Sequence, residues 1–198
     1  MTTPSATPTK RSGTHQGLGT YLGLAGALLA MIVLFSSLSS HFLSYSTFTT
    51  LANQIPDLMV LAVGMTLILI IGGIDLSVGS VLALAAAVVS VATLGFGWGI
   101  LPAALLGMAC AALAGSVTGI ITVAWGIPSF IVSLGVLEMA RGLAYQLTDS
   151  RTAYIGDAYA WLSTPFAAGI SPSFVIALLV IAAAHLLLTR TVFGRYLV

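Results

Sequence analysis

The sequence predicts an all-α membrane protein, a polytopic helix bundle with about six spans. Hydrophobic residues make up 59% of the 198 residues and charged residues only 6%, whereas an ordinary soluble domain has about 25% charged residues. No charged side chain occurs between Arg11 and Asp57, or between Asp75 and Glu138. Because about 20 apolar residues cross a bilayer, several spans fit into these stretches.

Hydropathy places the spans in order along the chain. They cover 18–38, 58–73, 76–95, 99–124, 128–147 and 172–190. Residues 1–17 are rich in Thr, Ser and Pro without apolar periodicity, which predicts a disordered tail before a transmembrane domain over 18–198. The first apolar run is longer than the core of a signal peptide, which favours an uncleaved span, although "SSLSS" leaves cleavage open.

Basic residues predict the orientation. Those on the side of the N-terminus are Lys10, Arg11, Arg190 and Arg195, and only Arg151 lies on the other side. Since Lys and Arg are enriched in cytoplasmic loops, the N-terminus is predicted to be cytoplasmic.

Two segments outside the spans have structure of their own. In "STFTTLANQI", residues Phe48, Leu51, Ala52 and Ile55 follow helical spacing, which predicts a helix on the outer membrane surface that ends at Pro56. The loop over 148–171 carries Tyr154, Tyr159, Trp161 and Phe166. These aromatic side chains are interpreted either as interfacial anchors or as a docking surface for an external partner.

The polar stretch "IIGGIDLSVGS" (70–80) interrupts the apolar sequence between the second and third spans. Glycine in a helix interior costs about 1 kcal/mol relative to alanine, so the two adjacent glycines predict a helix end. The carboxylate of Asp75 can accept hydrogen bonds from the N–H of Ser77 or Val78 at the start of a new helix. We expect that helix to restart at Leu76.

Two interpretations of this break are open. It is either a short cytoplasmic turn with Asp75 as an ordinary helix cap, or a broken helix that lines a solute path. At membrane depth, non-helical backbone occurs only where it packs in protein or lines a wet cavity.

Glu138 and Arg141 lie three residues apart on one face of the fifth span. At this spacing they can pair, which lowers the cost of a charge in the membrane. The pair is interpreted as a structural clamp or as a solute contact. In the fourth span, small residues repeat every four positions, which predicts close helix packing: Gly107, Ala111, Gly115 and Gly119.

The composition argues against enzymatic and nucleic-acid functions. Lys10 is the one lysine and lies in the tail, so no Walker-type phosphate loop can form and ATP hydrolysis would need another chain. The single cysteine, Cys110, allows no internal disulfide. The histidines are scattered, and no metal or cofactor site is predicted. The basic residues form no cluster that would bind nucleic acid.

Several stretches resemble permeases of bacterial ABC importers for monosaccharides, the ribose and xylose type. They are "GMTLILIIGGIDLSVGSVLAL", "AGSVTGIITVAWGIPSFIVSLG", "ARGLAYQLT" followed by "SRTAYIG", and "TRTVFGRYLV". The resemblance implies a multi-pass subunit of the bacterial inner membrane. It would pair with a second permease subunit, most simply as a homodimer. A periplasmic sugar-binding protein would deliver the solute, and a cytoplasmic ATPase would drive import.

The family motif falls on particular residues of this chain. It covers Gly72, Gly73, Asp75, Ser77, Gly79 and Ser80, then Pro128, Phe130, Leu134 and Gly135, then Arg141, Gly142 and Thr148. The substrate-pathway residues that follow from the resemblance are Gly72, Gly73, Asp75, Ser77, Ser80, Ser129, Phe130 and Ser133. Among them, Asp75 would shape the broken helix, the hydroxyls of Ser77 and Ser80 would face the path, and Phe130 would form an apolar wall or gate.

The chain departs from the family pattern at Thr118, where the family often has Asn, and at Asp149 and Ser150, which replace a glycine pair. It ends at Val198, where family members continue, so we expect an N-terminal portion of a permease. Two other functions are kept as alternatives: a secondary transporter with a proton site at Asp75 or Glu138, and a non-functional truncated permease.

Overall fold

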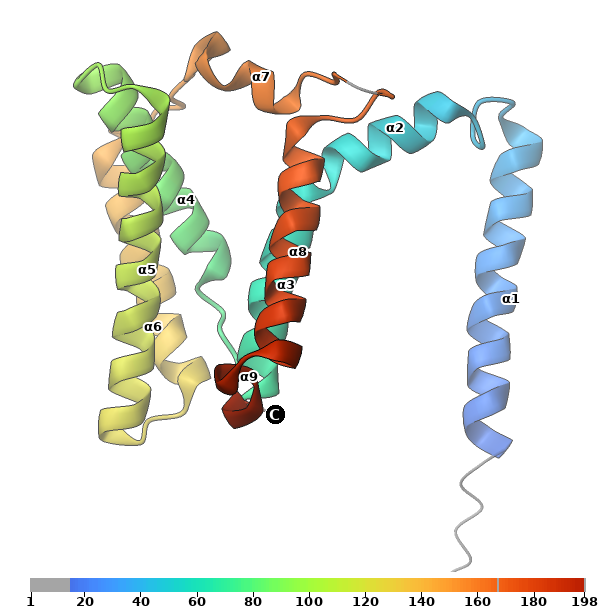
Figure 1. The fold of residues 1–198 in the computed structure, drawn as a ribbon, viewed down its shortest axis with the longest axis horizontal. Coiled ribbons are helices and arrows are strands. Elements are labelled where there is room, and N and C mark those ends of the chain that lie inside the picture. Colours follow the sequence, from blue (N-terminus) through green and yellow to red (C-terminus); the bar gives the residue numbers. More distant parts are fainter. Residues whose placement is uncertain (1–14, 167, 198) are drawn as a thin grey trace, which may run out of the picture. The chain divides into compact units, whose positions relative to one another are not determined.

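The computed structural model describes residues 15–166 and 168–197, which contain helices and no β-strand (Figure 1). The α-helices are α1 (His15–Leu38), α2 (Tyr45–Gln54), α3 (Pro56–Ile70), α4 (Val78–Ser90), α5 (Ile100–Trp125), α6 (Ser129–Leu147), α7 (Ala160–Ser163), α8 (Pro172–Arg190) and α9 (Val192–Leu197). A π-helical turn, η1 (Val91–Gly95), extends α4, and a 3-10 turn, η2 (Gly156–Tyr159), precedes α7. The predicted all-α fold is confirmed.

Within the described part of the chain, five helices are long and apolar enough to cross a membrane, and the number is six if α2 and α3 together form one bent span. The five correspond to predicted spans. The remaining predicted span, 58–73, corresponds to α3, which has 15 residues and ends at Ile70. The helix predicted from "STFTTLANQI" is present as α2, while its location on the outer membrane surface stays a prediction. Pro56 begins α3 as a proline in its first turn.

The chain divides into two compact units, Met1–Thr50 and Leu51–Val198. Of the predicted tail, residues 1–14 lie outside the described residues, and 15–17 belong to α1. In the first unit, the rings of Phe35 and Phe42 lie 5.6 Å apart across the turn after α1. The hydroxyl of Thr47 donates a hydrogen bond of 2.7 Å to the carbonyl of His41 in the same turn.

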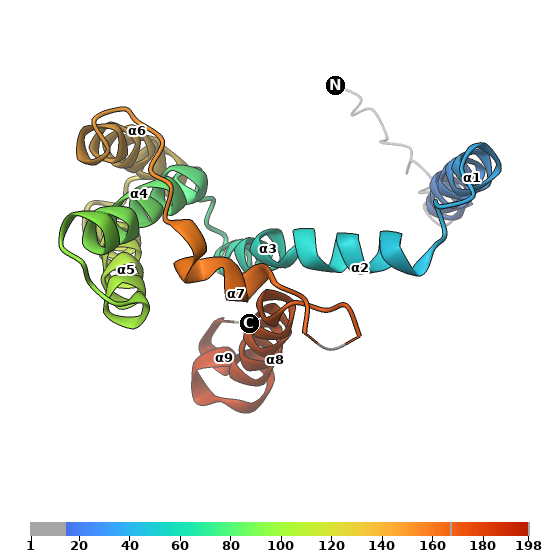
Figure 2. The same cartoon turned by 90° about the horizontal axis from the view of Figure 1, so that it is seen from above.

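The second unit contains two groups of helices. Helix α4 packs against both α5 and α6, whereas α3 packs against α8 (Figure 2). Residues 71–77 connect α3 to α4, and the segment with η2 and α7 connects α6 to α8. The two groups are therefore joined by two connections along the chain.

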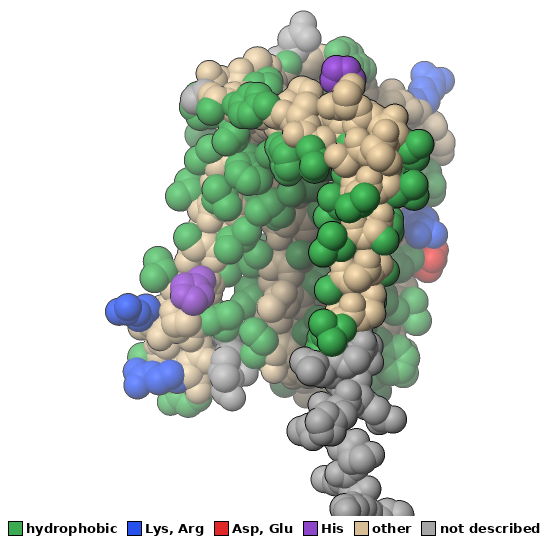
Figure 3. Space-filling model, turned by 90° about the vertical axis from the view of Figure 1, so that its right-hand side faces the viewer, with side chains coloured by type: hydrophobic (Ala, Val, Ile, Leu, Met, Phe, Trp, Pro, Cys, Tyr) green, Lys and Arg blue, Asp and Glu red, His purple; other side chains and the backbone are tan. Residues whose placement is uncertain are grey.

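Large apolar side chains are exposed on the helices of the second unit. Leu101, Val123 and Trp125 on α5 are 70%, 85% and 72% exposed. The space-filling view shows hydrophobic side chains along the helices and few charged ones between them (Figure 3). Apolar surface of this extent is unfavourable in water but suits a lipid environment, in agreement with a multi-pass membrane protein.

Candidate functional site

The predicted helix break is present as residues 71–77, the break segment, between α3 and α4. Its second residue is Gly72, whose φ of 76° lies in the left-handed region that glycine adopts without penalty. The N–H of Gly72 donates to the carbonyl of Leu69 at 3.0 Å, and the N–H of Gly73 donates to Ile68 at 2.9 Å. These bonds form a Schellman motif, which closes α3 before the residue 73 that hydropathy suggested.

Asp75 holds the other end of the break segment. Its Oδ1 accepts hydrogen bonds from the N–H of Ser77 at 2.7 Å and from the hydroxyl of Ser77 at 2.6 Å. The predicted bond to Ser77 is thus present. The prediction that the helix restarts at Leu76 is wrong: α4 begins at Val78, with Ser77 as its N-cap. The hydrogen bonds from Ser77 to the Asp75 side chain form a turn, and this turn delays the restart of the helix. The first backbone hydrogen bond of α4 therefore runs from the N–H of Val81 to the carbonyl of Ser77, at 2.9 Å.

Two serines of α6 bind the backbone between these ends. The hydroxyl of Ser129 accepts a hydrogen bond from the N–H of Ile74 at 2.9 Å. The hydroxyl of Ser133 accepts one from the N–H of Leu76 at 3.1 Å. Ser133 is fully buried and donates its own proton to the carbonyl of Phe130 at 3.1 Å. The structure therefore places two predicted pathway serines against the break segment.

The break segment keeps hydrogen-bond acceptors without a partner. The backbone carbonyl oxygens of residues 73–76 accept no hydrogen bond from any residue that the structure describes. The donors at Ile74 and Leu76 are satisfied by serine hydroxyls. The segment thus presents carbonyl oxygens and the carboxylate of Asp75, which are all acceptors.

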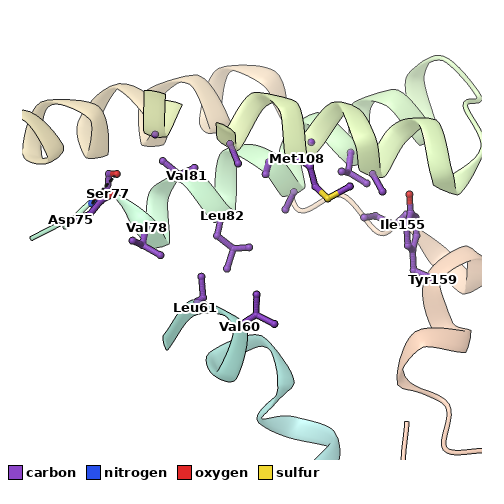
Figure 4. A pocket seen from close by; sticks show the side chains of 17 residues that line it. Val60, Leu61, Asp75, Ser77, Val78, Val81, Leu82, Met108, Ile155 and Tyr159 are labelled. Atoms are coloured by element: carbon purple, nitrogen blue, oxygen red, sulfur yellow. Dashed lines mark hydrogen bonds between the residues drawn. The ribbon is translucent and has the colours of Figure 1, made fainter. Parts of the chain in front are cut away.

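A cavity of about 610 Å³ lies between α3, α4 and α5, a size typical of small-molecule sites. Asp75 and Ser77 line one end, and Ile155 and Tyr159 line the opposite end (Figure 4). Val60 of α3 faces α4 across the space. The remaining wall is apolar or glycine: Leu61, Val78, Val81, Leu82, Ala85, Ala86, Val89, Ala104, Gly107, Met108, Ala111 and Gly115.

Tyr159 is a cavity residue that the sequence placed in an outer loop. Its hydroxyl lies 3.4 Å from the hydroxyl of Thr93 and donates to the carbonyl of Ile100 at 3.5 Å. These contacts bring η2 back against η1 and the start of α5. By contrast, Trp161 and Phe166 are exposed, at 52% and 68%, and whether they are membrane anchors or a docking surface stays open.

A second cavity of about 370 Å³ lies between α4 and α6, lined by Ser80, Arg141 and Tyr145 among others. The predicted contact between Arg141 and Glu138 is present, with Nη1 and Oε1 3.7 Å apart. Their side chains are 53% and 71% exposed, so the pair lies on the surface of the described chain.

The predicted pathway residues thus separate into groups. Asp75 and Ser77 line the first cavity and Ser80 the second. Gly72, Gly73, Ser129 and Ser133 shape the break segment, while Phe130 is 44% exposed and lines neither cavity. A role of Phe130 as a wall or gate stays a prediction.

The small-residue face of α5 approaches α4 closely at one position. A Cβ on Gly107 would lie 2.6 Å from Cγ2 of Val89 and 3.1 Å from the carbonyl oxygen of Ala85. At Gly115 and Gly119 a Cβ would meet nothing within 4 Å. Close packing is therefore seen at Gly107 and not at those two glycines. No group of three or more His, Cys, Asp or Glu that could hold a metal ion occurs among residues 15–166 and 168–197.

Comparison with known protein families shows to which family the chain belongs. Residues 47–198 match the model of the family described as branched-chain amino acid transport system / permease component. The chain belongs to this permease family. The match includes the break segment and all the helices around both cavities.

Two proteins similar to this chain are named as transport permeases. The chain is 36% identical over 174 residues to the autoinducer 2 import system permease protein LsrC of Yersinia pseudotuberculosis, covering 85% of this chain and 49% of that protein. It is 30% identical over 196 residues to the probable ABC transporter permease protein y4mJ of Sinorhizobium fredii, covering 98% of this chain and 58% of that protein. The chain thus spans about half the length of these relatives. No solved structure matches it.

Proposed function

We propose that this chain is part of the membrane-spanning permease of an ABC importer and forms the path of a monosaccharide through the bacterial inner membrane. A periplasmic binding protein delivers the sugar, and a separate cytoplasmic ATPase supplies the energy. A second permease subunit completes the path, and the N-terminus lies in the cytoplasm. The chain itself needs no cofactor for this role.

The observation that carries the proposal is the break segment at the end of the 610 Å³ cavity. Non-helical backbone is tolerated at membrane depth where it lines a wet space. Two residues of this segment, Asp75 and Ser77, line the cavity. A broken helix at a cavity is the arrangement that transporters use for solute contact.

The chemistry of the cavity suits a neutral hydroxylated solute. Sugar hydroxyls donate hydrogen bonds, and Asp75, a lining residue of the cavity, carries a carboxylate that accepts them. The rest of the wall is mostly apolar, so few polar contacts hold the solute and release stays fast. The choice of a monosaccharide rests on the resemblance of the motif around Asp75.

The relatives support the transport class. One is named an import permease for autoinducer 2 and another a probable ABC transporter permease. The first name favours an importer, and the second favours an ATP-driven transporter over a proton-coupled one with a site at Asp75 or Glu138.

Uptake in the native bacterium tests the substrate. Cells lacking the gene are complemented with wild type, Asp75→Ala or Asp57→Asn and supplied with labelled D-ribose or D-xylose. Asp57 is exposed in the first turn of α3, at the end of that helix away from the break segment, so it serves as the control. We expect Asp75→Ala to abolish uptake while the protein still inserts in the membrane. Normal uptake by Asp75→Ala would remove this carboxylate from the site, and no uptake of either sugar by wild type would reject the substrate class.

Co-purification tests the partners. The chromosomal gene is tagged at its N-terminus, and proteins purified with the product are identified by mass spectrometry. Recovery of a nucleotide-binding subunit is expected. Absence of any ATPase, together with uptake that stops when the proton gradient is collapsed, would favour a secondary transporter. Absence of an ATPase without uptake would favour a non-functional permease fragment.

A further inference from the structure

We propose that Ser129 and Ser133 are positioning residues that hold the break segment in its non-helical form. Together they bind the N–H groups of Ile74 and Leu76. By doing so they keep Asp75 at the cavity, and this last step rests on the proposed function. In this role the two serines act through the break segment and do not need to touch the solute.

The spacing of the two elements matches. Ser129 and Ser133 are one turn apart on the same face of α6, about 6 Å along a helix that rises about 1.5 Å per residue. Ile74 and Leu76 are alternate residues of a segment without helical structure, and alternate N–H groups of a stretched chain lie up to about 6.6 Å apart. Each hydroxyl therefore meets one N–H, in the same order along both elements.

The bonds replace those that a helix would have supplied. An N–H without a partner is strongly unfavourable in a membrane environment, so the break can persist only if its donors find acceptors. Backbone carbonyls do not supply them here, because both N–H groups bind side-chain hydroxyls. Helix α6 thus stabilises the break, to which α4 is directly connected.

The geometry disfavours direct solute binding by Ser133. Its proton is donated to Phe130 and one lone pair accepts Leu76, while the residue is fully buried. Only one acceptor position of the hydroxyl is left. Its contribution to transport therefore passes through the position of the break segment.

Hydrogen–deuterium exchange measures this clamp directly. The purified protein in lipid nanodiscs is compared as wild type, Ser129→Ala, Ser133→Ala and the double variant, with mass spectrometry of peptides that cover residues 71–77. The matched control is Ser90→Ala, because Ser90 is also buried but donates its hydroxyl only to Ala87 within α4. We expect exchange in the break segment to become about fivefold faster for each bond lost, and to stay unchanged in the control.

Unchanged exchange of residues 71–77 in both single variants would overturn the proposal. The single variants give this result even if the double variant does not fold. Sugar uptake in the complemented cells provides the second measurement. We expect the variants with faster exchange to lose sugar uptake. Ser129→Thr keeps the hydroxyl, so its exchange rate and its uptake should both match the wild type. Loss of uptake with normal exchange would instead make the serines solute contacts. If wild type takes up neither D-ribose nor D-xylose, the proposed substrate fails while the exchange result still decides the clamp.

Discussion

The side-chain oxygen of Asn53 accepts a hydrogen bond from the backbone N–H of Ser171 at 2.8 Å. The same amide donates through Nδ2 to the carbonyl of Gly169 at 2.9 Å. Ser171 is the N-cap of α8 and is fully buried. One side chain at the end of α2 thus fixes the point where the chain enters α8.

Replacing this amide should lower stability. Asn53→Ala removes both bonds and leaves a buried N–H at Ser171, a loss of about 1–3 kcal/mol. The expected change is a decrease of several degrees in the Tm of the purified protein in detergent. Gln54→Ala is the control, since Gln54 is exposed and is the next residue along α2. Equal Tm values for the two variants would show that the Asn53 bonds do not contribute.

Asp75→Asn separates the charge of this residue from its shape. Asparagine keeps an oxygen that can accept the N–H and hydroxyl of Ser77, so the turn before α4 should survive. We expect Asp75→Asn to retain most of the uptake that Asp75→Ala loses. If both variants lose uptake equally, the negative charge is required, as it would be for a proton site.

Gly72 should tolerate few side chains. Its φ of 76° costs about 1–2 kcal/mol for an ordinary residue and less for asparagine. Gly72→Val should therefore lower the Tm more than Gly72→Asn. The measurement is thermal unfolding followed by circular dichroism, and an equal effect of the two substitutions would argue against the Schellman end as its cause.

Gly107 and Gly115 form a matched pair on α5. At Gly107 a Cβ would lie 2.6 Å from Val89, so Gly107→Ala should destabilise the contact with α4 by about 1–3 kcal/mol. At Gly115 the space is open, so Gly115→Ala should be neutral or raise the Tm through better helix propensity. Adding Val89→Ala to Gly107→Ala should recover part of the loss. A Gly107→Ala variant with unchanged Tm would mean that the two helices can separate without cost.

Glu138 and Arg141 can be tested as a pair. Arg141→Ala leaves the carboxylate of Glu138 without its cation in an apolar environment, which should lower the Tm of the protein in nanodiscs. Glu138→Gln combined with Arg141→Ala should recover stability, because no unpaired charge is left. Wild-type Tm for Arg141→Ala would show that the pair does not stabilise the fold.

The sequence was sufficient for the helices because their ends carry local signals. Pro56 and Pro172 start α3 and α8, and the glycines at 72 and 73 end α3. Helix α4 begins two residues later than the sequence predicts, at Val78 instead of Leu76, because hydropathy does not register the turn that Asp75 makes with Ser77. The π-helical turn η1 was also invisible, because it continues the apolar pattern of α4.

The contacts that build the site come from residues distant in sequence. Ser129 and Ser133 could be named as motif positions, but their bonds to Ile74 and Leu76 follow from how α6 packs against the break. Tyr159 reaches the cavity through contacts with Thr93 and Ile100. Neither contact has a periodic pattern that a single sequence could reveal.

The serine clamp also constrains how the protein is made. The acceptors for Ile74 and Leu76 lie 55 and 57 residues later in the chain. During synthesis, α3 and α4 therefore leave the ribosome well before α6 can bind them. Until then, water at the insertion machinery must solvate the two N–H groups, so release of this region into lipid has to wait for α6. A ribosome stalled before Ser129 should hold the α3–α4 pair in a state still accessible to water.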